Sequence, residues 1–345
     1  MKFTNSIFMM LIIIILTLVS SCKKSTDDNP KTVELKSPTN ITETSFTANW
    51  NLITSDVKSI FIEIAFDNNY ENIVKQIEAN NTQSSLIIDD MLGATKYFHR
   101  LVVEFNDGSI SKSGTKSLRT SYITETVTFT TSDDMTIAGK IYYLGSNDTP
   151  KPGIIFMHEM GVFVNNWNSS DVVLGLVAKG YVCLAFDFRG HGNSTPVDDL
   201  SILLSDKSLI ANDLKAALSF LKNQTKVDPS NIALVGASLG AIMAVAGNGY
   251  EEVKTSVSVS GIEDGIYEIF PDLSISSALY VVGEFDIHDV PNGNFPKEAQ
   301  SMYDISQEPK KLIIVQGASA HGTELLTSVS LVTEIINWIE SQFNR

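Results

Sequence analysis

Three side chains that lie far apart in the sequence have the types needed for nucleophilic catalysis. Ser238 stands at the centre of residues 236–240, which read Gly-Ala-Ser-Leu-Gly. A serine hydroxyl is a weak nucleophile at neutral pH, so it needs a base within hydrogen-bond reach and a group that orients this base. Among the five histidines of the chain, His321 is our candidate base, and Asp286 is the candidate orienting carboxylate. Together these types predict acyl transfer through a covalent acyl-enzyme.

The serine lies at a predicted strand-to-helix turn. An apolar run, residues 232–235, precedes it, and a helix-compatible stretch, residues 241–246, follows it. Glycines lack a Cβ atom, so they leave room for a tight turn that pushes the serine hydroxyl outward. The pattern G-x-S-x-G is weak by itself. The strand and the helix around it are what favour a nucleophile at this position.

From about residue 121, apolar strands alternate with helical segments. This alternation predicts a mostly parallel sheet that is covered on both faces. Ligands of such sheets gather at the carboxyl ends of the strands. His321 follows the last predicted strand and Asp286 follows the one before it, so both side chains can meet Ser238 at one edge. We expect an antiparallel pair at 127–129 and 137–143, strands at 153–157, 181–186, 232–235, 257–259, 279–282 and 312–315, and helices at 170–179, 209–221 and 329–339.

Two further motifs flank the serine turn. Residues 187–194 read Asp-Phe-Arg-Gly-His-Gly-Asn-Ser, and residues 227–232 read Val-Asp-Pro-Ser-Asn-Ile. They resemble the D-x-R-G-x-G-x-S loop and the V-D-P-x-x-I approach to the serine strand in the α/β-hydrolase superfamily, which this part of the chain resembles over essentially its full length. The order serine, aspartate, histidine is also the order of that fold.

The resemblance implies an α/β fold with a doubly wound, mostly parallel sheet. It implies Ser238 as nucleophile, His321 as general base and then acid, and Asp286 as the orienting carboxylate. Asp289 and Glu284 remain alternatives for the carboxylate.

Backbone donors for the developing oxyanion are expected from two turns. One is the N–H group of Leu239, directly after the nucleophile. The other comes from residues 158–161, which read His-Glu-Met-Gly where the superfamily often has His-Gly-x-Gly. This variant resembles the dienelactone-hydrolase-like branch. We expect the N–H group of Met160 to be the second donor, with Glu159 as the alternative, and His158 to brace the loop.

The remaining histidines are not expected to be ligands. We expect a structural or surface role for His99 on a strand, loop architecture for His191, and a solvent-exposed loop for His288, with a contact to the substrate or the catalytic groups as the alternative. Histidines at metal-ligand spacing and a phosphate-binding G-x-x-x-x-G-K-[ST] loop do not occur in the sequence. The sequence therefore implies neither a metal nor a cofactor.

An alternating pattern of a different kind runs from residue 33 to residue 120. Its short apolar-polar strands predict a β-sandwich. Pro38, Trp50 and residues 92–97, which read Leu-Gly-Ala-Thr-Lys-Tyr, resemble the opening, the core tryptophan and the tyrosine corner of a fibronectin type III domain. The resemblance implies an N-terminal all-β, fibronectin type III-like sandwich that acts as a spacer or binding module.

The first residues predict export. Lys2 precedes an apolar stretch at 7–19, which is short for a membrane span and fits a signal peptide. Residues 19–22, Val-Ser-Ser-Cys, resemble a bacterial lipobox, which implies lipidation of Cys22 and an exported, membrane-anchored protein at the outer membrane or cell surface. An ordinary signal peptide and an uncleaved anchor are the alternatives. The predicted parts are a lipoprotein signal peptide (1–21), a tether (22–32), the fibronectin-like domain (33–120) and the catalytic domain (121–345).

The net charge argues against one class of partner, and the cysteine count argues against an intrachain disulfide. The formal net charge of −15 argues against nucleic acid, because a phosphate partner needs a basic surface. With Cys22 lipidated, Cys183 cannot form an intrachain disulfide, and its apolar surroundings predict a buried small side chain.

The substrate class depends on how the site is covered. Residues 262–277 are too short for a helical cap domain, and Tyr267, Ile269, Phe270 and Pro271 within them are expected to form a small apolar wall. We therefore expect an open site for short-acyl or accessible esters, small or polymer-borne. A serine peptidase of the same fold and a catalytically inactive binding module remain alternatives.

Overall fold

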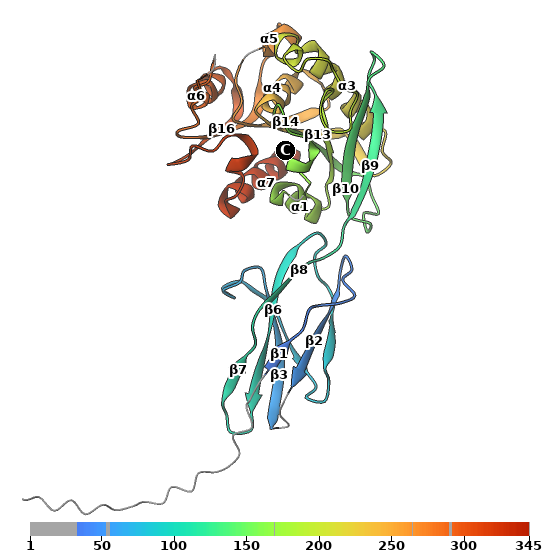
Figure 1. Cartoon of the computed structure of the whole chain (residues 1–345), viewed down its shortest axis with the longest axis vertical. Coiled ribbons are helices and arrows are strands. Elements are labelled where there is room, and N and C mark those ends of the chain that lie inside the picture. Colours follow the sequence, from blue (N-terminus) through green and yellow to red (C-terminus); the bar gives the residue numbers. More distant parts are fainter. Residues whose placement is uncertain (1–32, 53–55, 169, 264, 290–291, 345) are drawn as a thin grey trace, which may run out of the picture.

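The structure, a computed structural model, describes residues 33–52, 56–168, 170–263, 265–289 and 292–344. An all-β unit lies at one end and an α/β unit at the other (Figure 1). The predicted signal peptide, Cys22 and the tether at 22–32 lie outside the described residues. Within the described ranges, every helix is too short or too polar to cross a bilayer.

The all-β unit consists of antiparallel strands in two sheets that share one hydrophobic core. Alternate side chains of its longest strand, β6, are buried, as the period-two pattern predicts. The first sheet has the order β1 (Val33–Leu35), β2 (Phe46–Leu52), β5 (Ser85–Ile88). The second has the order β4 (Ile73–Ala79), β3 (Val57–Ala65), β6 (Lys96–Phe105), β7 (Ile110–Lys112), and β8 (Lys116–Arg119) also pairs with β6.

Two residues behind the fibronectin-like resemblance lie in this core. Trp50 is 1% exposed. The hydroxyl of Tyr97 accepts a hydrogen bond from the backbone N–H of Leu92 at 3.0 Å. A tyrosine bound in this way to backbone a few residues upstream is typical of the tyrosine corner of immunoglobulin-like sandwiches. The fibronectin type III assignment itself stays a prediction.

His99 on β6 is fully buried in the same core, where its ring packs edge-on against Phe46 with the centroids 5.2 Å apart. Burial lowers the pKa of His99 from 6.5 to about 4, because the charged imidazole would lose its hydration. His99 therefore becomes protonated near pH 6.5 in the unfolded chain, but only near pH 4 in the folded chain. The free energy of unfolding must therefore decrease as the pH is lowered from about 6.5 to about 4. For this one group the decrease is at most about 1.4 kcal/mol per pH unit.

We expect His99→Phe to weaken this acid sensitivity, since phenylalanine keeps the ring contact and does not titrate. The measurement is urea-induced unfolding at pH 7 and pH 5, comparing each protein's own change between the two. His158 in the α/β unit, with a pKa lowered by burial to about 3, contributes in the same direction and remains in the variant. An unchanged pH dependence would mean that His99 does not stay neutral in the folded protein.

The α/β unit is built on an eight-stranded sheet with the order β16-β15-β14-β13-β11-β12-β10-β9. The strands from β11 to β16 run parallel to one another, and β9 and β10 form an antiparallel pair at one end. The predicted mostly parallel sheet with its antiparallel pair is thus confirmed. The strands are β9 (Ile123–Thr130), β10 (Thr136–Tyr143), β11 (Lys151–Met157), β12 (Val182–Phe186), β13 (Val227–Ala237), β14 (Val253–Val259), β15 (Ser276–Gly283) and β16 (Gln307–Val315).

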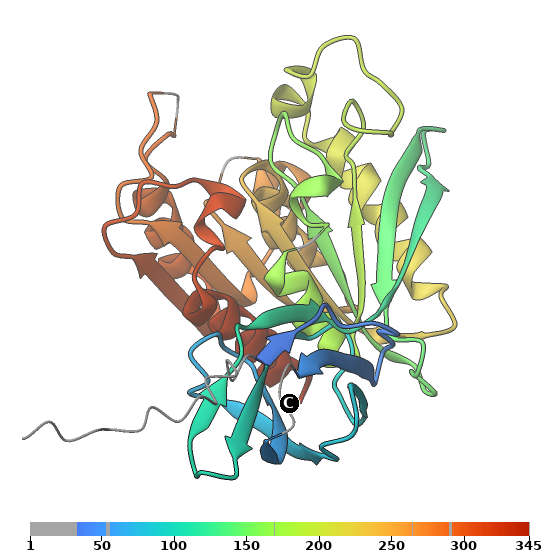
Figure 2. The same cartoon turned by 60° about the horizontal axis from the view of Figure 1, so that its bottom comes forward.

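Helices cover both faces of this sheet (Figures 1 and 2). The helices α1 (Asp171–Ala178) and α7 (Val329–Phe343) bury their apolar sides in one core. The helices α3 (Ser208–Lys222), α4 (Leu239–Ala246) and α6 (Phe295–Ile305) do so in the other. The short helices are η1 (Val164–Asn166), α2 (Ile202–Ser205), η2 (Gly247–Gly249), α5 (Ile266–Ile269) and η3 (Gly322–Leu325).

The helix α6 was missed by the sequence analysis. Its buried face is narrow, with Phe295, Ala299 and Met302 only, so its apolar periodicity is faint. The signal that could have revealed it is the start: the side chain of Asn294 accepts a hydrogen bond from the N–H of Lys297, and a proline stands in the first turn.

The two units touch at their adjoining ends. The Glu43 carboxylate of the all-β unit accepts a hydrogen bond from the N–H of Gly145 at 2.8 Å, and the Arg119 guanidinium lies 3.0 Å from the Asp171 carboxylate at the start of α1. Cys183 on β12 is fully buried, as predicted, and burial raises the pKa of its thiol.

Candidate active site

Three parallel strands bring the predicted site residues to one edge of the sheet. Ser238 directly follows β13, and Asp286 follows β15 after a short turn. His321 comes from the loop after β16, the next strand along. Because parallel strands end at the same edge, loops that are distant in the sequence meet there.

Ser238 occupies the strained turn that the motif predicts. Its φ of 50° and ψ of −112° place it in the left-handed half of backbone space, which costs a non-glycine residue free energy. A Cβ atom on Gly236 would lie 1.9 Å from the carbonyl oxygen of Gly240, and one on Gly240 would lie 2.4 Å from the carbonyl oxygen of Met157. Both glycines are therefore required for the close approach of β13, α4 and β11.

Asp286 and His321 are joined by hydrogen bonds. The Nδ1 atom of His321 lies 2.9 Å from Oδ1 and 3.1 Å from Oδ2 of Asp286, whose side chain is fully buried. The ring of Phe295 packs against the imidazole, with the centroids 4.4 Å apart. Within the described chain, the hydroxyl of half-buried Ser238 makes no hydrogen bond. The structure thus pairs two of the three predicted residues and places the third on a strand end of the same edge.

The alternatives for the carboxylate lie elsewhere. Asp289 is exposed at the surface. The Glu284 carboxylate accepts a hydrogen bond from the N–H of Gly317 at 2.7 Å, which ties two turns together. Of the three acidic residues considered, Asp286 is the one that contacts His321.

Ser260 was missed by the sequence analysis. It follows β14 with a φ of 52°. Its hydroxyl donates to Asp286 Oδ2 at 2.6 Å and accepts from the N–H of Gly322 at 2.9 Å, so it links the loops of Asp286 and His321. The available signal was a small polar residue directly after the strand that lies between β13 and β15.

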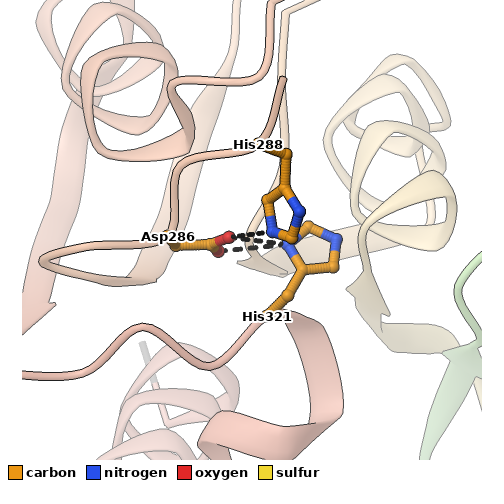
Figure 3. Close-up of side chains that lie close together, drawn as sticks. All are labelled: Asp286, His288 and His321. Atoms are coloured by element: carbon orange, nitrogen blue, oxygen red, sulfur yellow. Dashed lines mark hydrogen bonds and ion pairs between the residues drawn. The ribbon is translucent and has the colours of Figure 1, made fainter. Parts of the chain in front are cut away.

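His288 is an exposed loop residue, as expected, and it also contacts the site. Its side chain is 47% exposed, yet its Nε2 atom lies 3.0 Å from Asp286 Oδ1. The loop folds back because the N–H of His288 donates to the carbonyl of Gly293 at 2.8 Å, and the ring packs edge-on against Phe295. The alternative that the sequence left open, a contact to the site residues, is what the structure has (Figure 3).

The loop at 158–161 is braced by two histidines. The Nε2 atom of His158 accepts a hydrogen bond from the N–H of Phe188 at 3.0 Å, and burial lowers the pKa of His158 to about 3, so its ring is neutral. His191 Nε2 accepts from the N–H of Gly161 at 3.0 Å, which occupies that donor. The structural roles predicted for both histidines agree with these contacts.

Two backbone donors at this edge stay available. Within the described chain, the N–H groups of Leu239 and Met160 donate to no protein group. They lie on the turn after Ser238 and on the loop after β11, where the sequence predicts the two donors of an oxyanion hole.

Glu159, which stands where the superfamily often has glycine, has a structural partner. Its carboxylate accepts a hydrogen bond from the N–H of Thr323, two residues after His321. A Cβ atom on Gly322 would lie 2.0 Å from Glu159 Oε1, so a glycine is needed there to admit the carboxylate. The Glu159 side chain therefore links the 158–161 loop to the loop of His321.

A buried ion pair holds the loop that carries His191. The Arg189 guanidinium is 1% exposed and lies 2.8 Å from the fully buried Asp213 carboxylate and 2.6 Å from Asp133. Burial alone would lower the pKa of Arg189, but these hydrogen-bonded carboxylates raise it. The hydrogen bonds from Arg189 lower the pKa of Asp133 to about 2. The D-x-R-G-x-G-x-S motif thus supports the 158–161 loop through His191, which accepts the hydrogen bond from the N–H of Gly161.

The predicted apolar wall is wrong. Phe270 packs against Tyr250 and Gly249, which follow the C-terminal end of α4, whereas Ser238 lies at the N-terminal end. The reason is topological: a segment joining two parallel strands must return to the opposite edge of the sheet before the second strand begins. The helix in this segment, α5, has four residues, so no helical cap lies there in the described chain.

Comparisons with known proteins agree with this architecture. Residues 154–318 match the model of the Alpha/beta hydrolase family. The quorum-quenching protein AidA of Acinetobacter baumannii is 31% identical over 108 residues, which make up 31% of this chain and only 34% of that protein. The esterase Pf2001 of Pyrococcus furiosus has a TM-score of 0.50 at 20% identity, covering 64% of this chain and 93% of that one.

The alpha/beta hydrolase GrgF from Penicillium sp. sh18 has a TM-score of 0.51 at 17% identity, covering 65% of this chain and 100% of that one. These two structural likenesses show the fold alone. The C-terminal unit of this chain therefore has the alpha/beta hydrolase fold, and residues 154–318 within it match the model of that family.

Proposed function

We propose that the protein is a serine hydrolase that cleaves carboxylic esters with Ser238, His321 and Asp286. The observation that carries the proposal is the hydrogen bond between His321 Nδ1 and the buried Asp286 carboxylate, at the edge where the strained turn presents Ser238. An imidazole held with Nδ1–H toward a carboxylate keeps its Nε2 lone pair free to accept the serine proton.

The reaction follows from these positions. Ser238 Oγ attacks the acyl carbon while His321 Nε2 takes its proton, and the oxyanion accepts hydrogen bonds from the N–H groups of Leu239 and Met160. His321 then donates the proton to the leaving alcohol, which leaves an acyl-serine. Water attacks the acyl carbon with His321 again as base, and Ser238 is regenerated. Catalytic hydrogen bonds of a free enzyme often tighten only when substrate binds, so the unbonded Ser238 hydroxyl does not contradict this role.

A fluorophosphonate probe tests this assignment, because it phosphonylates only a serine that a base activates. We expect wild-type protein to be labelled at Ser238 and Ser238→Ala to lose both labelling and ester hydrolysis. Ser219→Ala, on the exposed side of α3, is the matched control and should keep both. Unlabelled wild-type protein would contradict the proposal and favour the inactive binding module.

The short segment between β14 and β15 favours short or exposed acyl groups as substrates. A long acyl chain needs apolar cover, and among the described residues between β14 and β15 the only helix is the four-residue α5. We expect kcat/KM for p-nitrophenyl acetate and butyrate to exceed that for the palmitate ester. The opposite order would overturn the short-acyl proposal. Peptide amides are tested in parallel, because a peptidase hydrolyses them and an esterase does not. The structural neighbour Pf2001 is an esterase by name.

We also propose that the protein is an exported lipoprotein, anchored at the outer membrane or cell surface through Cys22, with the all-β unit as spacer. The lipobox-like residues 19–22 support this. Cells fed a labelled palmitate analogue should incorporate it into wild-type protein. Incorporation that persists in Cys22→Ser would contradict the anchor.

A further inference from the structure

His288 has a position that the proposed reaction does not use. Its Nε2 atom and His321 Nδ1 approach the same oxygen, Asp286 Oδ1, at 3.0 Å and 2.9 Å. Figure 3 shows both rings directed at this carboxylate from opposite loops. One atom from each of the three side chains lies within 4.8 Å of the others. Two imidazoles and one carboxylate converging on a point are the donor set of a zinc site with one open position.

The distances suit a metal ion. Ligand atoms at about 2.0–2.1 Å from Zn²⁺ in a tetrahedron lie about 3.4 Å apart. The two spacings to Asp286 Oδ1, 2.9 and 3.0 Å, need an opening of only a few tenths of an ångström, and the two imidazole nitrogens lie within 4.8 Å of each other. The side chains of His288 and His321 are 47% and 24% exposed, so an ion can enter from solution and water can fill the fourth position.

The carboxylate is supported from the inside as a metal ligand usually is. Asp286 Oδ2 accepts the hydrogen bond from the Ser260 hydroxyl, which leaves Oδ1 facing the two histidines. Hydrogen bonds of this kind orient ligating side chains and strengthen metal binding. His288 is held in turn by its backbone hydrogen bond to Gly293 and by Phe295.

We propose that Asp286, His288 and His321 form a Zn²⁺ site that reversibly switches off the hydrolase. An ion bound to Nδ1 of His321 displaces the proton from that nitrogen. The neutral imidazole then carries its proton on Nε2, so Nε2 cannot accept the proton of Ser238. Binding depends only on the three ligands, whereas the inhibition rests on the proposed function.

The binding test uses the full chain with Ser238→Ala, stripped of metal, and titrates Zn²⁺ by calorimetry and Co²⁺ by its visible absorption. We expect saturable binding and a Co²⁺ spectrum typical of nitrogen and oxygen ligands in a tetrahedron. His288→Phe in this background keeps the ring packing and should weaken binding by about tenfold or more. Asp289→Asn, which changes an exposed neighbouring carboxylate, is the control and should bind like the parent. Equal affinity in the His288→Phe protein would overturn the site.

The inhibition test compares, for each protein, hydrolysis of p-nitrophenyl acetate with Zn²⁺ and with EDTA. Wild-type protein should lose activity in Zn²⁺ and regain it in EDTA, and His288→Phe should need about tenfold more Zn²⁺ for the same loss. Zn²⁺ binding without loss of activity would overturn the switch. If the wild-type protein binds Zn²⁺ but neither reacts with the fluorophosphonate probe nor hydrolyses esters, the proposed function is wrong and the metal site is supported.

Discussion

Asp286→Asn should lower kcat for ester hydrolysis by about 10⁴-fold while the protein stays folded. In the wild type, Oδ1 faces His321 and Oδ2 is held by the Ser260 hydroxyl. An asparagine that keeps its oxygen toward Ser260 turns its NH₂ group toward His321. The Nδ1 atom must then accept a hydrogen bond, so the imidazole proton moves to Nε2 and the ring can no longer act as base.

The measurement is kcat for p-nitrophenyl acetate with thermal unfolding as the check on folding. Asp289→Asn is the matched control, since its side chain is exposed and outside the hydrogen-bonded group. It should retain activity close to that of the wild type. If the Asp286→Asn substitution lowered kcat by less than about tenfold, Asp286 would not be the group that orients the base. Asp289 and Glu284 would then have to be considered again.

Gly236→Ala should destabilise the α/β unit by about 3 kcal/mol or more and abolish labelling of Ser238. The added methyl group would lie 1.9 Å from the carbonyl oxygen of Gly240, 2.2 Å from its carbonyl carbon and 2.7 Å from the nitrogen of Ala241. All three are backbone atoms, so no change of rotamer relieves the clash. The start of α4 must move away from β13, and Ser238 and the N–H of Leu239 move with it.

Gly114→Ala is the control for this variant, because a Cβ atom there meets nothing within 4 Å and its φ is not positive. Its effect on stability should stay within about 0.5 kcal/mol. Thermal unfolding and the rate of fluorophosphonate labelling are measured for both. A folded Gly236→Ala protein that labels at the wild-type rate would show that the tight turn is dispensable.

The site draws its rigidity from side chains that link separate loops. Ser260 connects the loops of Asp286 and His321, and Glu159 connects the loop of His321 to the one that offers the N–H of Met160. Groups held in this way are already oriented before substrate arrives, which is how an active site lowers the cost of reorganisation during the reaction. The same tight grouping leaves Asp286 Oδ1 within reach of a second imidazole, that of His288.

The elements that local pattern controls could be predicted from the sequence. Strands buried on both faces have apolar runs that need no partner to be recognised, as in β11 and β12. The amphipathic stripe of α3 and the glycines around Ser238 are equally local, because helix periodicity and the steric needs of a tight turn are set by adjacent residues. The order of Ser238, Asp286 and His321 along the chain follows from the sequence in the same way.

Only the tertiary structure decided which side chains meet. It placed Asp286, and neither Asp289 nor Glu284, against His321, because one turn of the loop separates a buried carboxylate from an exposed one. In the folded chain Ser260 and His288 contact that carboxylate. Phe270 lies near the C-terminal end of α4, away from Ser238. Such contacts join loops from different strands, and their distances depend on sheet order and loop path, which no local pattern of residues encodes.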